Sequence, residues 1–220
     1  MIDIFNNNIV NALVGYTSVK KICVGTNIVW EKPYDAEVEY LESKEGAYID
    51  TGVRASGNLH IKVYLVDYFT ESYYGSWAFG GRDAFNNKAF GIYINANTHK
   101  VEQAYYNNTT TRNLYSSYPQ SCWVEMKSGS LKIGNTTHTF TGRTFTSSYN
   151  FYLFGLNNGG SFAGGKDKKL GAAYITNGVT TLNLIPVRKN GIGYYYDTIS
   201  GNLIGNSSDV GFFNYGNDVN

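Results

Sequence analysis

The stretch from Leu170 to Phe213 constrains the fold most strongly, because tight-turn signals divide it into short apolar runs. These signals are Asn177-Gly178, Asn190-Gly191 and Ser200-Gly201. Gly and Asn tolerate the positive φ angles that primed hairpin turns need, so each pair predicts a hairpin. The carboxylate of Asp197 is placed to accept hydrogen bonds from the turn amides that follow it. The stretch is therefore predicted to be a meander of antiparallel strands.

Pro186 lies within one of these apolar runs, Leu182 to Val187. Proline has no amide hydrogen, so it cannot donate a bond to the ladder of a sheet. The run is therefore expected at the edge of a sheet or at a bulge, and not in the middle of a sheet.

The rest of the chain carries the same kind of pattern. Between Leu59 and Tyr68 apolar and polar residues alternate, as they do around Ile92 and Val124, which places every second side chain on one face of a strand. Tyr and Gly are abundant and there are only three prolines, a composition that favours strands joined by tight turns. The sequence predicts an all-β chain that folds into a two-sheet antiparallel sandwich without helices between its strands.

Two groups of motifs resemble those of a known family. Leu184 to Arg188, which reads LIPVR, and Gly193 to Leu203, which reads GYYYDTISGNL, look like the C-terminal signature of concanavalin A-like (LamG-type) jelly-roll domains. Glu39 to Ser43 and Tyr48 to Val53 are similar to the opening of the same domains. This version of the domain is associated with structural proteins of tailed bacteriophages. The resemblance implies a jelly-roll domain over residues 37–220.

Residues 1–32 are predicted to form a small N-terminal β-hairpin attachment module. The run Ala12 to Val19 is echoed by Ile22 to Val29, and a repeat of this length is typical of successive hairpin arms. The segment looks like short attachment modules at the N-termini of phage tail and fibre proteins. Residues 33–36 are the expected linker, since proline cannot continue a ladder. The residues expected to make the virion attachment are Ile9, Leu13, Val14, Ile22, Val24, Ile28 and Trp30.

The register of this module follows from its turn. If Gly25-Thr26 is a two-residue loop, Lys20 faces Glu31 and Lys21 faces Trp30 across the strands. The first pair joins opposite charges, and the second places a cation over an indole. A segment this short cannot bury much apolar surface alone. It therefore needs a partner, either the jelly roll or another virion chain.

Aromatic residues near polar turns give the best indication of a ligand. Sugars present apolar C–H faces that stack on aromatic rings, and hydroxyls that bond to amide groups. Binding usually occurs on loops, and residues 71–76, 80–87, 105–117 and 156–169 are the expected loops. The competing interpretation is that these rings belong to the core or to a subunit interface. The candidate carbohydrate-binding residues are Tyr73, Tyr74, Trp77, Tyr105, Tyr106, Asn157 and Asn158.

An acidic run at the start of the main domain raises an alternative, a glycan hydrolase of the jelly-roll class built on Glu37, Glu39 and Glu42. In a strand, Glu37 and Glu39 share a face, and paired carboxylates carry out glycoside hydrolysis. The pattern resembles the acidic strand of laminarinase-type hydrolases, but Glu39 stands where those have Asp, and the run lies at the opening edge of the domain. A charged first strand that resists edge pairing is the plainer interpretation. No catalytic residue is assigned, and the chain is not expected to be an enzyme.

No metal or organic cofactor is expected, although Ca²⁺ is an ion for which the sequence offers ligands. Asp83 and Asn86 carry the oxygen atoms that Ca²⁺ prefers, whereas the three histidines have no second His or Cys at ligand spacing. The formal net charge of +1 provides no basic stripe for nucleic acid. No apolar run approaches the length needed for membrane insertion.

Together these features predict a structural virion protein of a tailed bacteriophage, made in the host cytoplasm. It is expected to be a head-fibre, capsid-decoration or tail-fibre component that displays a lectin-like domain to host-surface polysaccharide. The other expected partners are virion proteins of the capsid or tail, and further copies of the chain in a homotrimer. A purely structural capsid decoration protein without glycan binding remains an alternative.

Overall fold

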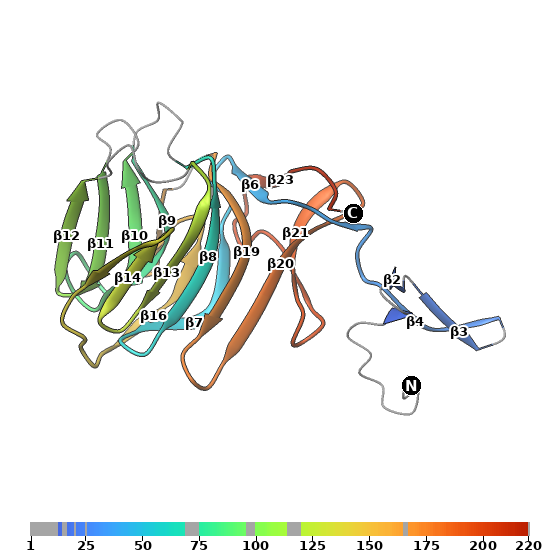
Figure 1. Cartoon of the computed structure of the whole chain (residues 1–220), viewed down its shortest axis with the longest axis horizontal. Coiled ribbons are helices and arrows are strands. Elements are labelled where there is room, and N and C mark those ends of the chain that lie inside the picture. The colour runs from blue at the N-terminus through green and yellow to red at the C-terminus, as the bar shows by residue number, and fades with distance from the viewer. Residues whose placement is uncertain are drawn as a thin grey trace.

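The computed structural model describes residues 13–14, 17–19, 21–24, 26–68, 75–95, 100–113, 120–164 and 167–219. Across these ranges the chain forms strands and turns, arranged as two large sheets and two small two-stranded ones (Figure 1). The described ranges contain no helix with the length and apolar character needed to cross a membrane. The predicted all-β, antiparallel architecture is confirmed.

The first large sheet has the strand order β12-β11-β10-β9-β16-β7. These strands are β7 (Ile49–Ser56), β9 (Ser76–Arg82), β10 (Ala89–Asn95), β11 (Lys100–Tyr106), β12 (Asn108–Asn113) and β16 (Thr146–Leu153). A short hairpin of β17 (Leu156–Asn158) and β18 (Ser161–Ala163) joins this sheet where β17 pairs with β9.

The second large sheet has the order β15-β14-β13-β8-β19-β20-β21-β22. These strands are β8 (His60–Val66), β13 (Cys122–Lys127), β14 (Ser130–Ile133), β15 (Thr136–Thr139), β19 (Lys169–Thr176), β20 (Thr181–Lys189), β21 (Ile192–Asp197) and β22 (Leu203–Ile204). Three further strands complete it: β5 (Ala36–Glu37) pairs with β20, and β6 (Leu41–Lys44) pairs with β19 and β23 (Phe212–Tyr215).

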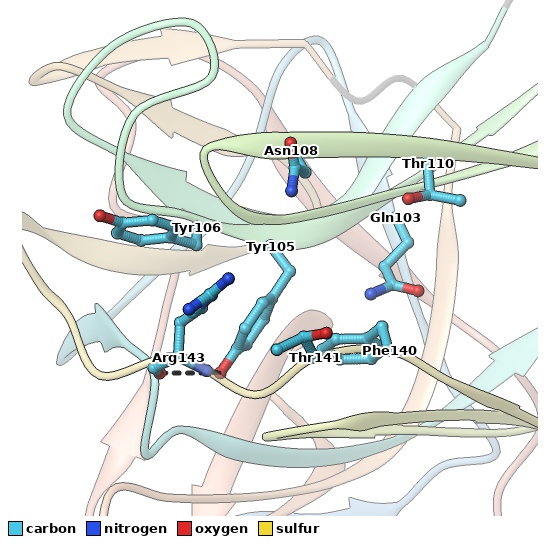
Figure 2. A pocket seen from close by; sticks show the side chains of 8 residues that line it. All are labelled: Gln103, Tyr105, Tyr106, Asn108, Thr110, Phe140, Thr141 and Arg143. Atoms are coloured by element: carbon cyan, nitrogen blue, oxygen red, sulfur yellow. Dashed lines mark hydrogen bonds between the residues drawn. The ribbon is translucent and has the colours of Figure 1, made fainter.

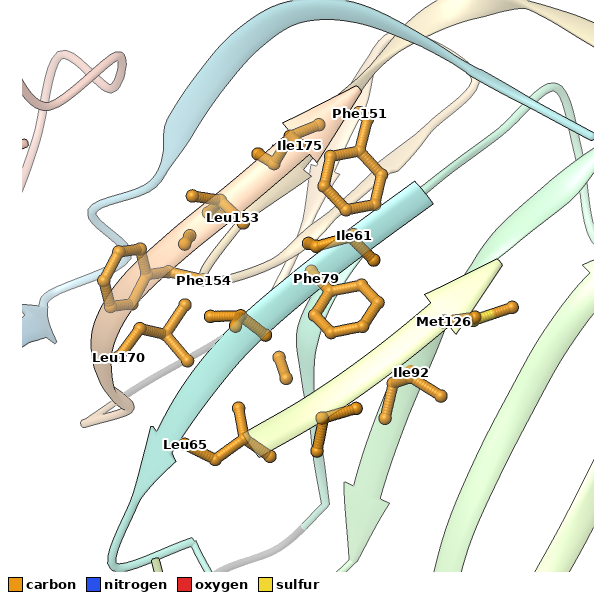
Figure 3. Close-up of a cluster of buried hydrophobic side chains, with 14 of the residues drawn as sticks. Ile61, Leu65, Phe79, Ile92, Met126, Phe151, Leu153, Phe154, Leu170 and Ile175 are labelled. Atoms are coloured by element: carbon orange, nitrogen blue, oxygen red, sulfur yellow. The ribbon is translucent and has the colours of Figure 1, made fainter. Parts of the chain in front are cut away.

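The two large sheets share one hydrophobic core, which gives the molecule its sandwich-like form (Figure 3). On β8, Ile61 and Leu65 are fully buried, whereas Lys62 between them is exposed. From the other sheet, Phe79 and Phe151 lie in the same core with their ring centroids 5.6 Å apart. The inward faces expected from the alternation of apolar and polar residues are therefore confirmed.

The turns predicted in the C-terminal meander are confirmed. Asn190 and Gly191 have φ angles of 51° and 75°, the positive values that a primed turn requires. Asn177 Oδ1 accepts hydrogen bonds from the amides of Val179 and Thr180 at 3.0 and 2.8 Å. These turns connect β19, β20 and β21 as consecutive antiparallel neighbours.

The expectation that Pro186 marks an edge or a bulge is wrong, because β20 lies between β19 and β21 and pairs with β21 through Pro186 without a register shift. β19 pairs with β20 as far as Leu184, and β5 pairs with it opposite Val187. The carbonyl of Pro186 accepts a bond from the Val38 amide at 3.0 Å. In an antiparallel strand, the amide and the carbonyl of one residue point to the same side. The Pro186 nitrogen, which has no hydrogen to donate, therefore faces the point where pairing with β19 ends and pairing with β5 begins.

The N-terminal strands form the two small sheets. β1 (Leu13–Val14) pairs with β2 (Thr17–Ser18), and β3 (Lys21–Val24) pairs with β4 (Asn27–Glu31). Among the candidate attachment residues, Ile9 lies outside the described residues. Leu13 and Val14 are on β1, Ile22 and Val24 on β3, and Ile28 and Trp30 on β4. The Ile28 side chain is 52% exposed.

The predicted register of β3 and β4 is wrong by one residue. Lys21 lies opposite Glu31, where Lys20 was expected, and Trp30 is no longer opposite Lys21. The pairing shifts within β3 because β4 carries one extra residue there, as in a β-bulge. A slip of one residue changes every pair beyond it.

Residues 33–36, expected to be a linker, pack on the second large sheet. The Tyr34 side chain is 7% exposed, and its ring centroid lies 5.0 Å from that of Tyr196. Its hydroxyl donates a hydrogen bond to Glu37 Oε1 at 2.9 Å. β5 then continues this segment into the sheet beside β20. The connection is thus a fixed part of the domain.

Three of the expected loops contain strands. β9 extends to Arg82, β11 and β12 occupy most of residues 105–113, and β17 and β18 occupy most of residues 156–163. β12 reads NTTTRN and stands at the end of its sheet. An end strand has a solvent-exposed side, so it tolerates a polar sequence that alone suggests a loop.

Candidate functional site

The candidate carbohydrate-binding residues fall into two neighbouring groups. Tyr73 and Tyr74 lie outside the described residues. Tyr105 and Tyr106 line a pocket between the two large sheets. Trp77 and Asn158 both contact Arg82, at the end of β9. The sequence assigned these residues to three separate segments, and the structure brings Trp77 and Asn158 together around Arg82.

The pocket has a volume of about 130 Å³ and lies where β11 and β12 of one sheet face the segment that follows β15 of the other (Figure 2). Figure 2 shows side chains from both sides pointing into it. Its lining combines aromatic rings with amide, hydroxyl and guanidinium groups. The lining residues are Gln103, Tyr105, Tyr106, Asn108, Thr110, Phe140, Thr141 and Arg143.

Tyr105 lines this pocket from β11, so the expectation that residue 105 begins a loop is wrong. It is 4% exposed, and its ring centroid lies 4.7 Å from that of Phe140. Its hydroxyl donates to the carbonyl of Arg143 at 3.0 Å and accepts from the Arg143 amide at 3.1 Å. The carbonyl of Gly57 lies 3.3 Å from the same hydroxyl. These bonds tie the segment 140–145 to β11.

Tyr106 ends β11 with a φ angle of 57°, an uncommon conformation for an aromatic residue. Its half-buried ring lies 5.6 Å from Phe145 between centroids. Such backbone outliers concentrate at binding sites.

Polar groups line both the floor and the mouth of the pocket, because Gln103 is 2% exposed whereas Thr141 is exposed. Rings beside fixed amides and hydroxyls suit the C–H faces and hydroxyls of a sugar.

The second group surrounds the Arg82 guanidinium. Its Nε donates to Asn158 Oδ1 at 2.9 Å, and its Cζ lies 5.6 Å from the Trp77 ring centroid and 5.2 Å from that of Phe85. Phe85 is 73% exposed. Asn157 differs from its neighbour, because it is 3% exposed and its Oδ1 accepts the Gly160 amide at 2.9 Å. Asn157 therefore fixes a turn, and its role as a sugar contact stays a prediction.

Two hydrogen bonds connect the loop after Arg82 to the start of β12 and to the turn that precedes it. Asn86 Oδ1 accepts from Thr109 Oγ1 at 2.9 Å, and the Lys88 amide donates to Asn107 Oδ1 at 3.4 Å. The Arg82 group and the pocket therefore lie beside neighbouring loops at one end of the first large sheet.

The two Ca²⁺ candidates are engaged with protein donors. Asp83 Oδ1 accepts from Ser147 Oγ at 2.6 Å and from the Ser148 amide at 2.7 Å, and its Oδ2 lies 3.3 Å from Lys88 Nζ. Burial acts to raise the pKa of Asp83, but these hydrogen bonds and the charge of Lys88 hold it below its ordinary value. Asn86 Oδ1 is occupied by Thr109. In the described ranges, no group of three or more His, Cys, Asp or Glu residues could hold a metal ion.

The acidic run does not form one strand. Glu37 ends β5, Glu42 lies on β6, and Glu39 is between the two strands. Each carboxylate is also paired separately: Glu37 with Lys32 at 3.0 Å, Glu42 with Lys44 at 2.9 Å, and Glu39 with the Asn217 side-chain amide at 3.2 Å. The expectation that Glu37 and Glu39 alternate on one strand is therefore wrong.

Sequence reasoning missed most of the residues that complete the two groups. From the pocket these are Gln103, Asn108, Thr110, Phe140, Thr141 and Arg143, and around Trp77 they are Arg82 and Phe85. Phe140 and Arg143 lie on the segment that joins β15 to β16 and contact Tyr105 of β11, a contact between distant segments that no local pattern signals. Phe85 could have been noticed as a large apolar residue within a polar loop sequence.

Comparison of the chain with protein-family models, with curated proteins and with solved structures gave no match.

Proposed function

We propose that this chain is a structural virion protein of a tailed bacteriophage, a head-fibre, decoration or tail-fibre component. It attaches through its N-terminal segment and displays a lectin-like jelly roll that binds host-surface glycan without cleaving it. The observation that carries glycan binding is the pocket between the sheets, where Tyr105, Tyr106 and Phe140 lie beside amide and hydroxyl groups. Sugar-binding sites need this combination of apolar rings and fixed polar partners.

The N-terminal strands support the attachment role. β3 and β4 pair with each other and with neither large sheet. Ile28 on β4 is 52% exposed, an apolar surface that another virion chain or a second copy of this chain can cover. Homotrimerisation through this segment suits a fibre with cyclic symmetry. The packed segment around Tyr34 holds the domain close to the attachment point.

Binding without hydrolysis is favoured by the separation of the acidic residues. Paired carboxylates on either side of a scissile bond are what glycosidases require. Glu37, Glu39 and Glu42 lie on different elements, each with its own partner. The proposal therefore assigns these residues to structure.

Tyr106→Ala is expected to weaken glycan binding about tenfold, because it removes a half-buried ring from the pocket lining. The measurement is titration of the full chain with the host polysaccharide that a glycan array selects. Tyr174→Ala is the matched control, since Tyr174 is 36% exposed on β19 and distant in sequence from the pocket lining. Equal losses in the two variants, or new reducing ends in the polysaccharide, contradict the proposal. A blank array supports the purely structural alternative.

Deletion of residues 1–32 is expected to leave a folded domain that no longer joins particles. The core shared by the two large sheets begins with Val38, so its packing remains complete. Circular dichroism reports the fold, and cosedimentation with assembled particles reports incorporation. Incorporation of the truncated chain at the level of the full chain disproves the attachment role.

A further inference from the structure

Arg82 is held in an unusual environment for a surface arginine. It is half-buried, its Nε is occupied by Asn158, and its Cζ lies 5.2 and 5.6 Å from the centroids of two rings. The indole of Trp77 lies over Gly91, where an added Cβ atom would approach it to 3.2 Å. A glycine at this position lets the ring lie close to the sheet. The guanidinium is thus oriented by contacts on several sides.

No carboxylate compensates this cation in the part of the chain that the structure describes. The neighbouring Asp83 is held by Ser147, Ser148 and Lys88. The Arg82 side chain is half-buried, so its charge is partly withdrawn from water, and this burial lowers the pKa of the guanidinium. An ion that loses hydration without a counter-charge is costly, and a bound anion recovers that free energy.

The terminal nitrogens of a guanidinium form a planar fork that matches a carboxylate. Phe85 adds a 73% exposed ring beside this fork, and Trp77 adds a half-buried one. An acidic sugar offers both complementary features, a carboxylate and the apolar C–H face of its ring. We propose that Arg82, Trp77 and Phe85 form a subsite for a carboxylate-bearing sugar, and this rests on the proposed glycan binding. The host glycan is then an acidic polysaccharide.

The test titrates the full chain with oligogalacturonate and with its neutral methyl ester, by calorimetry. The wild-type chain binds the acid form, and Arg82→Gln weakens this binding by about 10- to 100-fold, the range expected for charge-assisted hydrogen bonds. Arg82→Lys keeps the charge but loses the planar fork, so its affinity for the acid form is expected to lie between those of the wild-type chain and of Arg82→Gln. Arg54→Gln is the control, because Arg54 is an exposed arginine on β7. This variant is expected to bind the acid form as tightly as the wild-type chain does.

The proposal is overturned if the wild-type chain binds the methyl ester as tightly as the acid, binds neither, or is unaffected by Arg82→Gln. Poly-glutamate that binds as tightly as oligogalacturonate overturns the assignment to a sugar. Melting temperatures of the variants exclude loss of the fold as the cause. If Tyr106→Ala still weakens binding of an array-selected neutral glycan while Arg82→Gln has no effect, the proposed function stands and the acidic subsite fails.

Discussion

Gly57→Ala is expected to lower the free energy of unfolding by about 3 kcal/mol and to destroy the pocket between the sheets. A Cβ atom on residue 57 would lie 1.9 Å from the carbonyl oxygen of Arg143 and 3.2 Å from the amide nitrogen of Phe145. Both are backbone atoms, so no side-chain rotation relieves the overlap and the segment 140–145 has to move. That movement breaks the hydrogen bonds that Tyr105 makes with this segment.

Urea unfolding measures the loss of stability, which in a chain of this length corresponds to a fall in melting temperature of about 6–12 °C. Glycan titration measures the loss of the pocket. Gly164→Ala is the matched control, because nothing lies within 4 Å of an added Cβ atom there. If the two variants are equally stable and bind glycan equally well, segment 140–145 does not depend on the missing side chain of Gly57.

The C-terminal meander could be predicted from the sequence because its determinants are local. Asn190 and Gly191 take positive φ angles that few other residues tolerate, and Asn177 bonds to amides two and three residues ahead. The inward faces of β8, β10 and β13 could be predicted for a similar reason. Alternation within one strand decides which side chains reach the core.

The pocket could not be predicted, because it depends on which segments face each other across the sandwich. Tyr105 precedes a polar run, which suggests an exposed residue. Its hydroxyl nevertheless bonds to the backbone carbonyl and amide of Arg143, on the segment 140–145. Whether its ring is buried depends on how closely the segment 140–145 approaches, and Gly57 permits that approach. No spacing within the sequence reports a contact of this kind.

The predictions for the N-terminal register and for the acidic run were wrong because the backbone is irregular in both places. One extra residue on β4 moved Lys21 to the position expected for Lys20. The break between β5 and β6 separated Glu37 from Glu42, although their sequence suggests one continuous strand. A periodic pattern assumes regular backbone, so it cannot locate a bulge or a break.

Asp197→Ala is expected to lower the free energy of unfolding by about 3 kcal/mol. The Asp197 side chain is 1% exposed and closes β21. Its Oδ1 accepts from the amides of Asn183 and Ile199 at 3.0 and 3.2 Å, and its Oδ2 accepts from the Ser200 amide at 3.2 Å. Alanine leaves these amides without their acceptor, and each unsatisfied buried donor costs about 1–3 kcal/mol. Water that reaches the outer amides reduces the sum.

Urea unfolding at neutral pH compares Asp197→Ala with Asp197→Asn and Asp209→Ala. Asparagine keeps one acceptor oxygen but places its amino group toward a backbone donor. Asp197→Asn should therefore lose about half as much free energy of unfolding as Asp197→Ala. Asp209 is exposed, so its replacement should change stability by less than about 0.5 kcal/mol. A loss for Asp197→Ala as small as for Asp209→Ala would mean that the turn geometry of residues 198–201 alone ends β21. Losses in the expected order instead identify the carboxylate as the group that joins β20, β21 and the turn that follows β21.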